Sequence, residues 1–127
     1  MGQVEIAPDF ELDFEPGPLE ELTQVLPAAN VLILATSYFE SVGVCFVTLD
    51  AATAASDWQT IKEQAHDLKG ISGTFGAKRL QQLSDELEHL AFDTEWARVP
   101  AILEAMKRTS ATAKVAIEKA LAVSAAA

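Results

Sequence analysis

The sequence predicts an all-α fold, an antiparallel four-helix bundle with a short accessory N-terminal helix. From Leu19 onward, apolar residues recur at steps of three and four, which is the period of an amphipathic helix. Neither a strand-like stretch nor a Gly/Ser linker divides residues 19–123. The chain has 127 residues, 50% of them hydrophobic, which is enough for one domain with its own core. We expect this domain at 19–123, an acidic arm at 1–18 and a frayed tail at 124–127.

The N-terminal arm has a different pattern. Phe10, Leu12 and Phe14 alternate with acidic residues at period two, as in a strand. The prolines and glycine of residues 16–18 then end the segment as a turn. Because an isolated strand is not stable, we expect the arm to lie extended across the domain or to be disordered.

The predicted helices follow one another with short breaks. The accessory helix spans 19–26 and ends before Pro27, and Asn30 is a candidate N-cap for a second helix that runs to about residue 55. We expect the apolar stripe of this second helix to consist of Leu34, Tyr38, Val42, Cys45, Leu49 and Ala52.

Three more helices complete the prediction. Ser56 and Gln59 form a capping-box pattern that opens the third helix, which ends near Thr74. A fourth helix begins near Gly76, and residues 92–94 form a loop. The last helix runs to about residue 123 after a separate turn at 94–99, with Pro100 in its first turn.

Composition excludes several classes of function. The 19 acidic and 9 basic residues give a formal net charge of -10, which disfavours nucleic acid and anionic membrane surfaces as partners. The only cysteine, Cys45, rules out a disulfide framework within the chain and is expected to be an inert buried thiol. The apolar run 31–49 contains Glu40 and has no basic flank, so we interpret it as a core helix and expect no membrane span. The N-terminus does not resemble a signal peptide, and we expect a cytoplasmic protein.

The third helix carries the residues that suggest chemistry. At 100° per residue, one face holds a predicted core stripe of Ile61, Ala65, Leu68, Ser72 and Phe75. His66 lies on another, solvent-facing arc, together with Gln59, Lys62, Glu63, Lys69, Gly70 and Gly73.

The neighbours of His66 suit a nucleophile that meets a partner protein. Glycine inside a helix costs about 1 kcal/mol relative to alanine, so Gly70 and Gly73 on one face suggest a bare surface for close approach. Lys69 is three residues from His66 and can reach an anion attached to the ring. A neutral imidazole beside a cation is a candidate nucleophile for a phosphoryl group.

The pattern that carries a family resemblance is Ala65-His66-x-Leu68-Lys69-Gly70-x-Ser72-x-x-Phe75-Gly76-Ala77, continuing to Leu87-Glu88. It resembles the histidine-containing phosphotransfer (Hpt) domain family over 19–123, most strongly over 57–90. This family is a four-helix bundle that passes phosphoryl groups between the aspartates of receiver domains in two-component phosphorelays.

The resemblance implies roles for particular residues. His66 would be the phosphoryl acceptor and donor, Lys69 would stabilise the phosphoryl group, and Gly70 would be the small residue that admits the receiver. Glu88 occupies a position from which some family members hydrogen-bond the histidine ring. We place Gln59, Lys62, Gly73 and Gln81 on the same face as supporting or docking residues.

The resemblance also implies what the protein needs from others. The expected partners are response-regulator receiver domains, the receiver of a hybrid histidine kinase, or both. We expect a monomeric phosphocarrier without an ATP site, kinase activity or cofactor of its own, and Mg²⁺ to be held by the partner receiver.

Two alternatives remain open at this stage. One is a regulator that binds receivers without accepting phosphate. The other is a di-metal carboxylate bundle built on the pairs Glu63-x-x-His66 and Glu86-x-x-His89, with Glu40 and Glu104 as further ligands. Against the metal site, both pairs are predicted to face away from the core.

Several other residues have an ordinary structural interpretation. His89 is expected on the solvated surface, and Trp58 and Trp96 are expected to pack at the edge of the core. The basic pair Lys78 and Arg79 is expected on a solvated face, near enough to the docking face to meet an acidic receiver rim.

Overall fold

The computed structural model describes residues 13–126, with side chains described for 13–123. This part of the chain is helical, without strands. The elements in chain order are α2 (Pro16–Val25), α3 (Ala28–Ala54), α4 (Trp58–Thr74), α5 (Lys78–Phe92), the 3₁₀ helix η1 (Trp96–Arg98) and α6 (Val99–Ala126).

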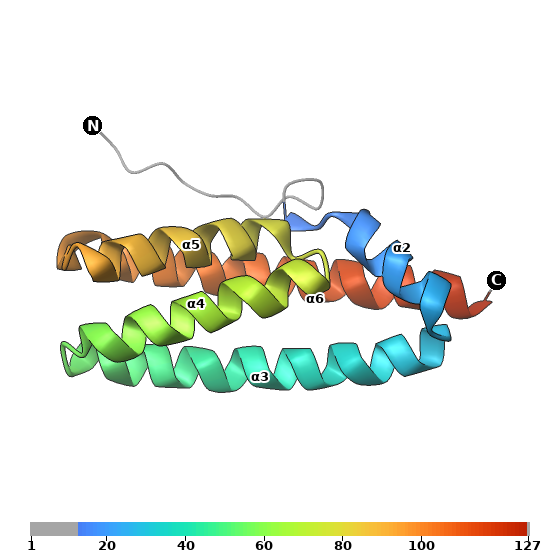
Figure 1. Ribbon diagram of the computed structural model, residues 1–127, viewed down its shortest axis with the longest axis horizontal. Coiled ribbons are helices and arrows are strands. Elements are labelled where there is room, and N and C mark those ends of the chain that lie inside the picture. The colour runs from blue at the N-terminus through green and yellow to red at the C-terminus, as the bar shows by residue number, and fades with distance from the viewer. Residues whose placement is uncertain (1–12, 127) are drawn as a thin grey trace.

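The long helices α3, α4, α5 and α6 lie side by side, and consecutive ones run in opposite directions (Figure 1). Each contacts two neighbours, in the closed order α3–α4–α5–α6–α3. Because α3 and α6 are each about ten residues longer than α4 and α5, they extend beyond them at one end by about 15 Å. The ten-residue helix α2 crosses this end and contacts α3, α4 and α6.

The core lies where the four long helices meet. The predicted core stripe of α4 is confirmed, with Ile61, Ala65, Leu68 and Ser72 fully buried and Phe75 nearly so. Full burial of a large aliphatic side chain, such as that of Ile61 or Leu68, stabilises the folded protein by about 1.5–3 kcal/mol. This stripe fixes the rotation of α4 about its axis and turns the opposite side, which carries His66, toward solvent.

The stripe of α3 differs from the prediction at its first turn. The buried residues are Val31, Ala35, Tyr38, Val42, Cys45, Leu49 and Ala52. Their spacing alternates between four and three, which keeps one seam against α4 and α6. Leu34 leaves this alternation and is 45% exposed, so its predicted place in the core is wrong.

Two helix starts also differ from the prediction. α3 begins at Ala28 because the Pro27 carbonyl accepts hydrogen bonds from Asn30 N and Val31 N, which places Asn30 inside the helix. Asp57, not Ser56, caps α4. Its carboxylate accepts from Thr60 N at 3.1 Å and from Thr60 Oγ1 at 2.6 Å. Ser56 has a φ of 54° and occupies the left-handed turn before the cap.

Further boundaries shift by a few residues. Pro16 begins α2, so residues 16–18 form its first turn instead of a turn that closes the arm. Proline is tolerated there because the first N–H groups of a helix have no intrahelical partner. α5 begins at Lys78 and includes Phe92, which we expected in a loop, and α6 continues to Ala126. Pro100 lies in the first turn of α6 after the separate turn η1, as predicted.

The end of the predicted arm lies against the turn between α4 and α5. Glu15 N donates to the Gly76 carbonyl at 2.7 Å, and Phe14 packs half-buried against the core. Gly76 has a φ of 78°, and a Cβ there would collide with the Glu15 carbonyl oxygen. The preceding twelve residues of the predicted arm lie outside the described part of the chain.

Helix α3 is long and apolar enough, by length and composition, to cross a membrane. Its buried residues form one seam of the helical core, and the core helix of a soluble protein passes the same test. The helix is therefore weak evidence for a membrane span.

Candidate functional site

His66 lies in the middle of α4, on the side opposite the buried stripe. Its side chain is 65% exposed, and its Nδ1 lies 2.9 Å from Glu88 Oε2 on α5. An ionised carboxylate can only accept hydrogen bonds, so the contact assigns the ring hydrogen to Nδ1. The Nε2 atom is then left with its lone pair.

Glu88 holds two groups at once. Its Oε2 accepts from His66, and its Oε1 accepts from Lys69 Nζ at 3.1 Å. Burial raises the pKa of Glu88, but the hydrogen bonds and positive charges of Lys69 and His66 outweigh it, so the pKa lies below its ordinary value. Glu88 is therefore a carboxylate at neutral pH, as the hydrogen-bond assignment requires.

Lys69 is paired with two carboxylates. Its Nζ donates to Glu88 and, also at 3.1 Å, to Asp85 Oδ1. Hydrogen bonds to Glu88 and Asp85 raise the pKa of Lys69 above its ordinary value. Sequence reasoning missed Asp85. The signal was available, because Asp85 precedes Glu88 by three residues and so shares its face of α5.

The two glycines of α4 differ in their surroundings. A Cβ added at Gly70 would meet nothing within 4 Å, so the backbone beside His66 is open. A Cβ added at Gly73 would collide with the Gln81 side-chain amide from α5. The surface is thus open at Gly70, and its role in admitting a partner stays a prediction. At Gly73 the small residue makes room for Gln81.

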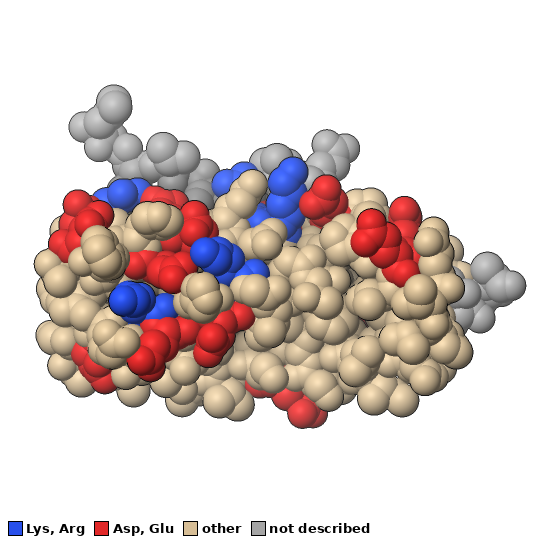
Figure 2. All heavy atoms as spheres, viewed as in Figure 1, with Lys and Arg blue, Asp and Glu red and all other residues tan. Residues whose placement is uncertain are grey.

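The remaining predicted docking residues surround this centre. Gln59 Nε2 donates to Glu63 Oε1 at 2.8 Å, one turn before His66. The Lys62 ammonium lies 5.8 Å from the centre of the Phe92 ring. Figure 2 shows acidic side chains gathered over the end of the molecule where α4 begins and α5 ends, with basic side chains among them.

Comparison with known proteins decides the family. The Hpt domain family matches residues 34–124, which is most of the chain. The chain belongs to the Hpt domain family.

A solved structure supports the same assignment. The chain is similar to histidine-containing phosphotransfer protein B (HptB) from Pseudomonas aeruginosa PAO1, with 27% sequence identity and a TM-score of 0.82. The match covers 87% of this chain and 96% of that one. No curated protein sequence matched the chain. The Hpt domain is thus a histidine phosphotransfer protein of a two-component phosphorelay, a phosphocarrier and not a kinase, and Hpt proteins interact with receiver domains.

The residues of the di-metal alternative do not come together in this Hpt domain. Among the described side chains, no group of three or more His, Cys, Asp or Glu residues could hold a metal ion. Glu40, Glu63 and Glu104 are exposed, and Glu86 forms an ion pair with Arg98. The four carboxylates of this alternative therefore do not face inward, as a di-metal centre would need.

Four of the residues with an ordinary interpretation lie as expected, namely His89, Trp58, Trp96 and Cys45, whereas Arg79, expected on a solvated face, is half-buried. The His89 side chain is 71% exposed and its Nδ1 lies 2.7 Å from the Asp85 carbonyl oxygen. Trp58 and Trp96 pack with ring centres 3.8 Å apart at the edge of the core. Burial and the nearby Asp67 charge raise the pKa of the buried Cys45 thiol to about 11, so it stays protonated and unreactive.

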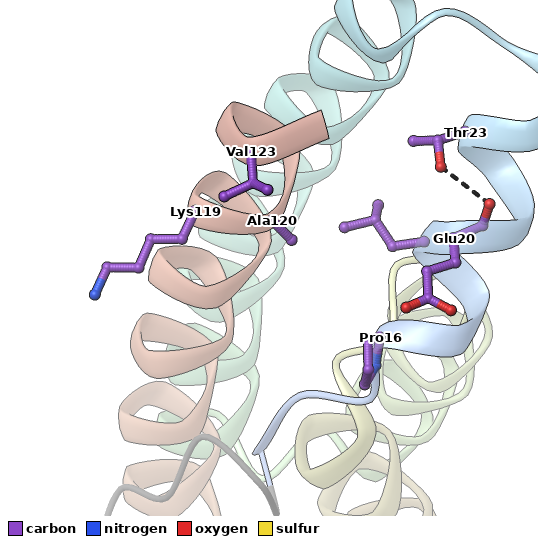
Figure 3. Close-up of a pocket in the computed structure, with 7 residues that line it drawn as sticks. Pro16, Glu20, Thr23, Lys119, Ala120 and Val123 are labelled. Atoms are coloured by element: carbon purple, nitrogen blue, oxygen red, sulfur yellow. Dashed lines mark hydrogen bonds between the residues drawn. The ribbon is translucent and has the colours of Figure 1, made fainter. Parts of the chain in front are cut away.

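A pocket of about 350 Å³ lies elsewhere in the Hpt domain, between α2 and α6 (Figure 3). Its walls are mostly apolar, with Glu20 and Lys119 at the edge. None of the predicted site residues lines it. The candidate site around His66 therefore lies outside this pocket.

Proposed function

We propose that His66 accepts a phosphoryl group from the aspartyl phosphate of one receiver domain and passes it to another receiver. The observation that carries this proposal is the exposed His66 ring, whose Nδ1 is held by Glu88 beside the open backbone at Gly70. The scaffold is an antiparallel four-helix bundle with α2 as its accessory helix. We infer that the protein acts as a monomer in the cytoplasm.

The transfer step follows from this arrangement. The Nε2 lone pair attacks phosphorus, the bond between phosphorus and the aspartyl oxygen breaks, and the aspartate leaves as a carboxylate with the bonding electrons. The Nδ1 hydrogen stays in place and is shared with Glu88, whose negative charge stabilises the positive charge of the phosphorylated ring. Positioning and charge neutralisation therefore supply most of the catalysis.

Lys69 stabilises the phosphoryl group in this proposal. An ammonium group has three N–H donors, and Asp85 and Glu88 occupy two of them. The third is available for a phosphoryl oxygen without breaking either contact. Asp85 and Glu88 thus hold the ammonium in position on the next turn after His66.

The Hpt domain brings no cofactor of its own to this reaction. The chain contains no glycine-rich phosphate-binding motif, so the phosphoryl group comes from the partner and not from ATP. Mg²⁺ is expected in the acidic pocket of the receiver, where it would neutralise the phosphoryl oxygens. The partner is a response regulator or the receiver of a hybrid histidine kinase.

A regulator that binds receivers without transfer is the second candidate. It would use the same face around Gly70. It would not need a hydrogen bond that directs the His66 lone pair outward, and this contact favours transfer. The di-metal alternative is not retained, because its carboxylates are exposed or ion-paired and form no metal-holding group among the described side chains.

The test is transfer from a radiolabelled, phosphorylated receiver. We expect label on the wild-type protein that is acid-labile and alkali-stable, as phosphohistidine is, and no label on His66→Gln. The matched control is His89→Gln, which removes the other histidine and should be labelled like the wild type. Label that persists in His66→Gln would refute the assignment, and binding without label would support the regulator.

A further inference from the structure

Phe92 is the last residue of α5, and its side chain is 74% exposed. Among the large hydrophobic side chains exposed in the described part of the protein, it is the only aromatic one. Its neighbours Leu90 and Ala91 are buried, so the end of the helix is packed while the ring projects outward. Neither the fold nor the transfer step explains this exposure.

The Phe92 ring is continuous with the phosphotransfer face. Phe92 follows Glu88 by one helical turn, and Glu88 holds the His66 ring. On α4, Lys62 precedes His66 by one turn, and its ammonium lies over the Phe92 ring at 5.8 Å. Phe92 therefore lies about one turn from the reacting histidine, on the surface that a receiver must cover.

The end of the molecule that carries Phe92 is held by packing and hydrogen bonds. The Trp58 and Trp96 rings lie with centres 3.8 Å apart, tilted by 35°, and pack against the core. Glu95 N donates to the Leu90 carbonyl at 2.9 Å, and Asp93 N donates to the His89 carbonyl at 3.0 Å, which closes the end of α5. These contacts hold the helix end from which the Phe92 ring projects.

The surroundings define the chemistry of the partner. Glu63, Asp93 and Glu95 are exposed and lie close in sequence to Lys62 or Phe92. Figure 2 shows acidic side chains gathered at the end of the molecule where α5 ends. Aromatic residues in the centre of a protein interface often supply much of the binding energy. A matching surface needs an apolar pocket with basic side chains at its rim.

We propose that Phe92 anchors the receiver domain, by inserting into an apolar, basic-rimmed pocket beside the receiver's phosphorylation site. This inference rests on the proposed function, because it concerns the docking of the same partner. The anchor affects binding of the receiver and not the chemistry at His66. Loss of the anchor and loss of the transfer chemistry therefore have different measurable consequences.

The test compares Phe92→Ala, Phe92→Leu and the control Val47→Ala, which removes an apolar side chain of similar exposure from α3. For each we measure the Kd for a receiver, the second-order rate constant of transfer from that receiver, and labelling of His66 by phosphoramidate. We expect Phe92→Ala to raise the Kd and lower the transfer constant about tenfold. Phe92→Leu should recover most of the loss, and Val47→Ala should behave like the wild type. Labelling by phosphoramidate should be unchanged in all variants.

Equal Kd values for the wild type and Phe92→Ala would overturn the anchor, as would an equal loss in Val47→Ala. A change in sedimentation of Phe92→Ala from dimer to monomer would also overturn it, because a second copy would then be the occupant. If the wild type binds the receiver but is not labelled by it, the proposed function fails while the Kd comparison still decides the anchor. If the wild type binds no receiver, both fail.

Discussion

Glu88 is the residue that organises the site. One of its oxygens holds His66 Nδ1 and the other holds the Lys69 ammonium, so a single carboxylate orients both the nucleophile and the nearby cation. Its side chain is only 21% exposed, which strengthens these contacts relative to bulk water. A change at Glu88 therefore affects both functional groups together.

We predict that Glu88→Gln changes the pH dependence of stability. Because the pKa of Glu88 is lowered in the folded protein, its contribution is present above its ordinary value of 4.5 and is lost as the pH falls through the lower, folded value. Glu88→Gln should reduce the free energy of unfolding by about 1 kcal/mol at pH 7. The difference from the wild type should shrink below about pH 4.5. Thermal unfolding between pH 3 and pH 7 measures this.

The control for this prediction is Glu63→Gln. In the wild type, the Glu63 carboxylate is exposed and accepts a hydrogen bond from Gln59. The substitution should have little effect on Tm across the same range. If the free energy of unfolding differed between the wild type and Glu88→Gln by the same amount at every pH, the electrostatic role of Glu88 would be contradicted.

At the scale of the helix, α4 has two glycines with different functions. Gly70 has open space above it, beside His66, whereas Gly73 is covered by Gln81 from α5. Helix propensity alone treats the two positions alike. The packing of α5 against α4 separates them, since Gln81 belongs to the neighbouring helix.

We predict different outcomes for alanine at these positions. Gly70→Ala should raise the free energy of unfolding by about 0.5–1 kcal/mol, because alanine is the better helix former and nothing obstructs its Cβ. Gly73→Ala should gain less or lose stability, because Gln81 must move. Urea denaturation of both variants measures the difference, and an equal gain at both positions would contradict the close approach of Gln81.

A larger side chain at Gly70 extends this comparison to function. Gly70→Gln should fold as stably as the wild type but transfer phosphate from a receiver more slowly, because it occupies the approach to His66. Normal transfer by Gly70→Gln would show that the receiver does not need the open backbone at this position.

At the scale of the whole molecule, the segment before α2 ties distant parts together. Glu15 is bound to Gly76 in the turn between α4 and α5, Phe14 packs on the core, and α2 then crosses the end of the bundle. The chain before the bundle therefore supports the turn that follows the His66 helix.

We predict that deleting residues 1–15 lowers the free energy of unfolding by about 1–3 kcal/mol, from the half-buried Phe14 ring and the lost hydrogen bond. The matched control is deletion of residues 1–12, which leaves the contacts of Phe14 and Glu15 in place. Urea denaturation of both shortened proteins is the measurement. Equal stability of the two would contradict a structural role for Phe14 and Glu15.

Local sequence signals predicted the helices well and their ends less well. The repeat of apolar residues identified α4 and its buried face, and with it the exposure of His66, because rotation about a helix follows from its own sequence. Ser56 and Asp57 are both good N-cap residues. The left-handed turn at Ser56 decided between them, and that turn depends on where α3 ends.

By itself, the sequence determined that this protein is helical, that His66 faces solvent beside Lys69 and Gly70, and that the motif is that of an Hpt domain. These properties depend on the order and spacing of residues along the chain. The family resemblance already implied a hydrogen bond between Glu88 and the His66 ring. Only the tertiary structure decided that Glu88 and Asp85 hold Lys69, that Gln81 covers Gly73, and that Phe92 projects beside the site. These contacts join α4 to α5, and their pairing depends on the relative rotation and offset of the two helices, which the packing of the whole core sets.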